Sequence, residues 1–198
     1  MSREMSRGHA PVEPPPARAA GDSLASVSRR TLAWIVDVVV VTVLVFVAVS
    51  VVDAVAGPAV SFRPESATLR DTVSVDKGLV ALNALFATAL SAAYFVIPWA
   101  RLGGSPAQLA LRMRVRGDGA GEPLTVGRAA ARWILLFPPF ATVSALAAGV
   151  PLLGWFVWGS ALVWYLVLLL TTAQSSTNQG LHDRIVGSVV RSRRAVAG

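Results

Sequence analysis

The 198-residue sequence contains no cysteine, which excludes disulfide bonds, thiolate metal sites and cysteine nucleophiles. It is also poor in charge, because Asp, Glu, Lys and Arg make up 15% of its residues, whereas soluble domains carry about 25%. Only two histidines occur, His9 and His182, and they lie far apart in the chain. We therefore expect no metal ion and no cofactor, and a chain with so few charges is not expected to be a soluble protein.

Apolar residues make up 54% of the sequence, and they gather in four long runs. A helix needs about 20 apolar residues to cross a bilayer. The runs at about 31–52, 79–99 and 152–173 reach this length, while a shorter run at 133–150 contains a Pro-Pro pair. We predict an all-α membrane protein with four transmembrane helices and a small cytoplasmic β-hairpin. A re-entrant feature in place of the last two spans is the alternative.

The basic residues indicate the orientation of the chain. Four spans place 15 of the 18 basic residues on one side, in the segment before the first run, the loop 100–132 and the segment after the last run. Basic residues concentrate on the cytoplasmic side of membrane proteins, so both termini are predicted to be cytoplasmic. The high pI of about 11.4 would also suit nucleic-acid binding. Because the arginines flank apolar runs, no nucleic-acid partner is expected.

The whole sequence divides into three parts. Residues 1–28 are rich in proline, alanine and serine, a composition that predicts a disordered cytoplasmic tail. Residues 29–193 form the predicted membrane domain, and 194–198 are a short tail.

The loop 100–132 carries an alternating segment. From Leu111 onward, Leu, Met and Val alternate with Arg112, Arg114 and Arg116, which is the period of a strand with one buried face. A glycine-rich turn follows. We predict a hairpin between Leu111–Arg116 and Leu124–Val126, with Ser188–Arg191 as a third strand. A basic amphipathic helix on the membrane surface is the alternative. The basic face of the hairpin would meet anionic lipid headgroups or an acidic partner.

Asp37 is the one charge inside the first run. A carboxylate at membrane depth is costly, so it usually faces the bundle interior and finds a partner. It either serves as an ion, proton or substrate site, or ties the first helix to a cytoplasmic element. Because few cations can approach from the same side, we expect a charged cluster at the cytoplasmic end of the bundle. Its predicted members are Arg30, Asp37, His182, Asp183 and Arg184.

Asn83, Ser91 and Tyr94 are polar residues of the second run. They share roughly one helix face, and we expect them to form hydrogen bonds between helices. No nucleophile–base pair accompanies them or the histidines, so no catalytic residues are proposed and an enzyme is not expected.

Four segments, in order, resemble the RDD family of bacterial membrane proteins, which is named for one arginine and two aspartates. Arg30 to Asp37 matches the Arg and the first Asp, and Gln179 to Val190 is similar to the closing motif, with Asp183 as the second Asp. Between them, 103–108 is similar to the family's Gly-x-Thr-x-Gly-Lys loop, and 112–121 followed by Arg132 resembles the next motif. The chain departs from the loop pattern because Ala107 and Gln108 stand where Gly and Lys are usual.

The resemblance implies residence in the bacterial cell membrane and, more loosely, transport. Two functions therefore compete. The chain is expected to be a scaffold or partner of other membrane components, with a second copy of itself or another membrane protein as its partner. The alternative is a small oligomeric transporter or ion-coupled carrier that uses Asp37, although one intramembrane carboxylate is little for a carrier.

Overall fold

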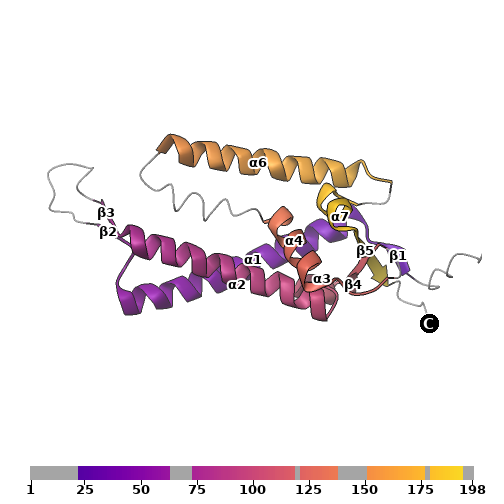
Figure 1. Ribbon diagram of the computed structural model, residues 1–198, viewed down its shortest axis with the longest axis horizontal. Helices are drawn as coiled ribbons and strands as arrows, with labels where there is room; N and C mark the ends of the chain where they lie inside the picture. Colours follow the sequence, from indigo (N-terminus) through magenta and orange to yellow (C-terminus); the bar gives the residue numbers. More distant parts are fainter. Residues whose placement is uncertain (1–21, 63–72, 119–120, 138–150, 177–178, 194–198) are drawn as a thin grey trace, which may run out of the picture.

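The computed structural model describes residues 22–62, 73–118, 121–137, 151–176 and 179–193 (Figure 1). Long helices run roughly along the longest axis of the molecule, with a small sheet at one end and a short hairpin at the other. We call these the sheet end and the hairpin end. In chain order the elements are β1 (Asp22–Leu24), α1 (Val27–Ala56), β2 (Val60–Phe62), β3 (Val73–Val75), α2 (Lys77–Arg101), α3 (Pro106–Ala110), β4 (Met113–Gly117), α4 (Val126–Leu136), α6 (Pro151–Ala173), α7 (Leu181–Val186) and β5 (Ser188–Arg193).

Three helices in the described part of the chain are long and apolar enough to cross a membrane: α1, α2 and the Trp155–Ala173 part of α6. Their large side chains are largely uncovered, and Phe46 and Trp155 are 71% and 79% exposed. Such surfaces are unfavourable in water and suit a lipid environment. The predicted fourth span at 133–150 begins within α4, and most of it lies outside the described residues.

The helix ends follow from local sequence. The hydroxyl of Ser26 caps α1 by accepting a hydrogen bond from Arg29 N, and α1 stops before Gly57, whose φ is +92°. Asp76 caps α2 by accepting from Leu79 N at 3.0 Å. α1 and α2 pack against each other, and α2 packs against α4.

The sheet has the order β1-β5-β4, and both pairings are antiparallel. Met113 and Val115 of β4 are fully buried and pack in one core with Phe95 and Trp99 of α2. The alternation predicted from the sequence is therefore observed within β4, where buried and half-buried residues alternate. The core fastens the sheet to the end of α2.

The predicted hairpin partner is wrong. β4 pairs with β5, with Val115 opposite Val190, and not with Leu124–Val126. The second predicted strand is occupied by a helix start, because Thr125 caps α4 and Val126 is its first residue. Ser188–Arg191, predicted as a third strand, is instead the central one.

The prediction that the disordered tail extends to residue 28 is wrong for residues 22–28. Residues 22–24 form β1, which pairs with β5, and α1 starts at Val27. Ala25 between them is fully buried, and its N–H donates to Val190 O at 3.1 Å. At the hairpin end, β2 and β3 pair antiparallel and form a two-stranded sheet that was not predicted from the sequence.

Candidate functional site

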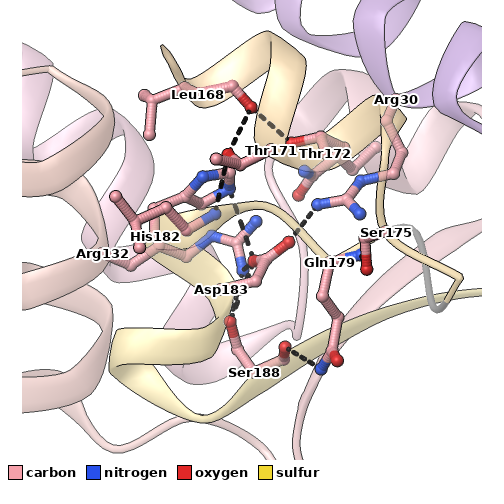
Figure 2. A network of polar contacts seen from close by, with 12 residues as sticks. Arg30, Arg132, Leu168, Thr171, Thr172, Ser175, Gln179, His182, Asp183 and Ser188 are labelled. Carbon is pink, nitrogen blue, oxygen red and sulfur yellow. Dashed lines mark hydrogen bonds and ion pairs between the residues drawn. The ribbon is translucent and has the colours of Figure 1, made fainter. Parts of the chain in front are cut away.

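A buried ion-pair cluster joins α1, α4 and α7 near the sheet (Figure 2). Asp183 of α7 is fully buried, and it pairs with Arg30 of α1 through one carboxylate oxygen. Its other oxygen, Oδ1, lies 2.5 Å from Arg132 Nη1 of α4. The hydroxyl of Ser188, at the start of β5, accepts from Arg132 at 2.7 Å and donates to Asp183 at 3.0 Å. One carboxylate thus ties together three helices and a strand.

Two glycines and an arginine fix the position of α7. A side chain at Gly180 would place its Cβ 2.8 Å from His182 Cε1, so any other residue at this helix start would force the buried imidazole to move. Gly187 ends α7 in the left-handed region, with φ at +62°. Arg128 of α4 donates to the carbonyl oxygens of Gly187 and Val186, the latter at 2.8 Å. These contacts satisfy carbonyls at the end of the short helix.

The cluster carries a net positive charge. Burial raises the pKa of Asp183, but Arg132 and Arg30 outweigh burial and hold that pKa well below its usual range. Burial lowers the pKa of His182 to about 4, so the imidazole, 3.4 Å from Asp183 Oδ1, is neutral at pH 7. Burial also lowers the pKa of Arg132, and Asp183 opposes this effect. Two guanidinium groups and one carboxylate give the cluster a formal charge of +1.

Asp37 occupies a separate polar site between α1, α2 and α3, and it is 1% exposed. Its carboxylate accepts hydrogen bonds from the hydroxyl of Ser105, from Tyr94 Oη at 2.9 Å and from Ala107 N at 3.1 Å. Ser105 is the residue that caps α3. Three donors therefore satisfy the carboxylate, and they hold the start of α3 against the first helix.

Gln108, which departs from the family loop pattern, has a defined role in the same place. Its Oε1 accepts from Trp99 Nε1 at 2.9 Å and from Ser105 N at 3.0 Å. The second bond completes a capping box, in which Ser105 and Gln108 each bond the other's backbone. Lysine has no acceptor and could make neither bond. The departure thus replaces a charge with an acceptor that stabilises the loop.

Three of the five residues predicted to converge do so, namely Arg30, His182 and Asp183. Asp37 does not join them, since no hydrogen bond or ion pair described here connects it to the cluster. The side chain of Arg184 is exposed, and within the described ranges it forms no ion pair with Asp183.

Arg132 and Ser188 complete the cluster in their place, and the predicted set did not include them. The signal for Arg132 was its position just before the third apolar run, where a second arginine can reach the same buried carboxylate. For Ser188 the sequence offers no comparable signal.

The predicted basic face is only partly a strand face. Arg114 and Arg116 are half-buried residues of β4, and Arg114 Nη1 donates to Leu102 O at 3.1 Å. Arg112 is exposed and precedes β4, with φ at +54°.

The predicted interhelical hydrogen bonds of the second run are confirmed. Asn83 Nδ2 donates to Asp53 of α1 at 3.0 Å, and Ser91 Oγ accepts from Trp133 Nε1 of α4 at 3.2 Å. Tyr94 reaches Asp37, as described above. Over the residues that the structure describes, no group of three or more His, Cys, Asp or Glu side chains is placed to hold a metal ion.

Comparisons with known proteins identify the family of the chain. No curated protein and no solved structure matches the chain. A family model described as the RDD family matches residues 24–187, which include Arg30, Asp37 and Asp183. This span covers most of the sequence, and the chain therefore belongs to the RDD family.

Proposed function

We propose that this protein is a non-catalytic, multi-pass scaffold of the bacterial cytoplasmic membrane. The observation that carries the proposal is the bonding of Asp37. Three donors of the chain itself satisfy its carboxylate, and its partners hold α3 in place. An ion-coupling carboxylate has to exchange its partners during a cycle, whereas Asp37 is built into a loop anchor.

The second aspartate supports the same function. Asp183 is fully buried and bonded to α1, α4 and β5. Asp183 therefore joins α1 and α4 to the sheet layer, and Asp37 joins α1 and α2 to α3, which packs against β4. A rigid layer of this kind, with Arg112 exposed beside it, suits a platform for anionic headgroups or for another membrane component.

We propose four crossings, with the sheet end in the cytoplasm. α4 is fixed at the sheet end by Arg128 and Arg132, and α6 ends there beside α7. α6 has 23 residues and is about 35 Å long, so its start lies toward the hairpin end, away from α4, and this supports a fourth crossing (Figure 1). The positions of the basic residues then support cytoplasmic termini.

Topology can be tested directly because the chain has no native cysteine. With an impermeant thiol reagent on intact cells, Ser66→Cys should be labelled, and Ser6→Cys should react only after permeabilisation. The opposite pattern would reverse the orientation.

Flux in proteoliposomes separates the scaffold from a carrier. We expect no sodium, potassium or proton flux above that of protein-free vesicles. We also expect Asp37→Asn to lower the melting temperature more than Asp53→Asn, since Asp53 is less buried. Cation-dependent proton flux that Asp37→Asn abolishes without loss of thermal stability would contradict the proposal and establish the carrier.

A further inference from the structure

A cavity of about 280 Å³ lies between α1, α4, α6 and α7, beside the ion-pair cluster. Its volume is many times that of one water, about 30 Å³. Apolar side chains dominate its walls, and two lining residues, Trp34 of α1 and Tyr165 of α6, lie with ring centroids 5.9 Å apart. The cavity therefore has room and lining for part of an apolar molecule.

The polar end of the cavity is cationic. Arg30, Arg132 and His182 all line it, and the group they form with Asp183 has a formal charge of +1. Two buried nitrogens in this wall, Arg132 Nε and His182 Nδ1, have no hydrogen-bond partner in the described part of the chain. A buried excess cation with an unpartnered donor is costly, and a bound anion would offset that cost.

The length of the cavity fits one membrane leaflet. Its lining residues on α6 run from Leu162 to Thr172, a rise of about 15 Å, and the hydrocarbon core of a bilayer is about 30 Å thick. The cationic end lies toward the end of α6, where α6 contacts α7. An acidic headgroup near the membrane surface and an apolar chain at membrane depth would match the two ends.

We propose that this cavity binds a membrane lipid with an anionic phosphate headgroup. The phosphate lies against Arg30 and Arg132, and part of one acyl chain lies between α1 and α6, along Leu162 and Leu166. The site is separate from Asp37 and from the basic residues of β4. It also does not rest on the scaffold function, since a carrier could contain the same lipid.

Binding can be measured on the full chain in detergent as a rise in melting temperature, because a ligand of the folded state stabilises it. The probes are phosphatidylglycerol, phosphatidylcholine with the same acyl chains, and inorganic phosphate. Leu166→Trp fills the cavity without touching the ion pairs. Leu170→Trp is the matched control on the same helix, because Leu170 does not line the cavity. The two leucines are similarly exposed, Leu166 at 49% and Leu170 at 54%.

We expect phosphatidylglycerol to raise the melting temperature of the wild type and of Leu170→Trp. The shift should be at least threefold smaller for Leu166→Trp, and phosphatidylcholine should give less than a third of the wild-type shift. Equal phosphatidylglycerol shifts in Leu166→Trp and Leu170→Trp would overturn the site, and equal shifts with both lipids would overturn the role of the anion. A full shift with inorganic phosphate would show that a free anion, not a lipid, is the occupant.

Discussion

Replacement of Asp183 by asparagine tests whether the ion-pair cluster holds the domain together. The variant keeps the size of the side chain and one acceptor oxygen, but it removes the charge that Arg30 and Arg132 share. Asp183 is fully buried and Arg132 is 2% exposed, so water cannot replace the lost partner. Arg132, which also lies over the ring of Trp99, would remain as a buried cation.

The expected cost follows from the burial of the pair. Breaking a buried ion pair by removing one partner costs about 3–5 kcal/mol. The retained acceptor places Asp183→Asn at the low end, about 3 kcal/mol. For a chain of this size, each kcal/mol lowers the melting temperature by about 2–4 °C, so we expect a decrease of about 6–12 °C in detergent.

The assay is thermal unfolding of purified variants, with Asp118→Asn as the matched control. Asp118 is exposed next to β4, and its replacement should change stability by less than about 0.5 kcal/mol. The double variant Asp183→Asn with Arg132→Gln should cost at least about 1 kcal/mol less than the sum of the single variants. If Asp183→Asn has the same melting temperature as Asp118→Asn, the cluster does not stabilise the domain. Strict additivity in the double variant would lead to the same conclusion.

Three further predictions concern the neighbouring residues. The changes that Arg30→Gln and Asp37→Asn make to the free energy of unfolding should add to within about 0.5 kcal/mol, because the two residues belong to different networks. Strong coupling in the double variant would show that the two networks are joined. Stability should fall as the pH decreases from about 6.5 to about 4, because the unfolded chain takes up a proton on His182 that the folded chain, with its pKa of about 4, excludes. Thermal unfolding across this range should lose that dependence in His182→Gln and keep it in His9→Gln. Gln108→Lys introduces the usual residue of the family loop, yet it should destabilise this chain by about 2 kcal/mol, because two donors lose their acceptor. An unchanged melting temperature would refute this role of the glutamine.

The sequence allowed Arg30 and Asp183 to be predicted in one charged cluster, because Arg30 precedes the first span, Asp183 follows the last one, and a buried carboxylate at that end of the bundle was expected to find a cation. The same argument was wrong for Asp37. Charge counting assumes that a buried carboxylate needs a charge, whereas neutral donors satisfy Asp37. Those donors meet only when the loop after α2 folds back on α1, and composition and spacing do not reveal such a fold.

The pairing of the strands could be predicted only in part, for a similar reason. Alternation correctly identified the buried face of β4, since period-two burial is a local property. Partner choice is not local, and the nearest segment, Leu124–Val126, was preferred because hairpins join neighbours. Thr125 and Val126 instead start a helix, and the true partners of the sheet come from segments far apart in the sequence.

The central position of β5 has a consequence for the order in which the protein assembles. β1 and β4 do not pair with each other, and each pairs with β5, which the ribosome makes after both of them. Domains generally fold as they are synthesised, from the N-terminal side onward, but this layer has to wait. Until residues 188–193 emerge, α1 and α2 can already be in the membrane while both outer strands still lack their neighbour. A chain that ends early would therefore retain its first spans and have two unpaired strand edges, which a quality-control protease could recognise.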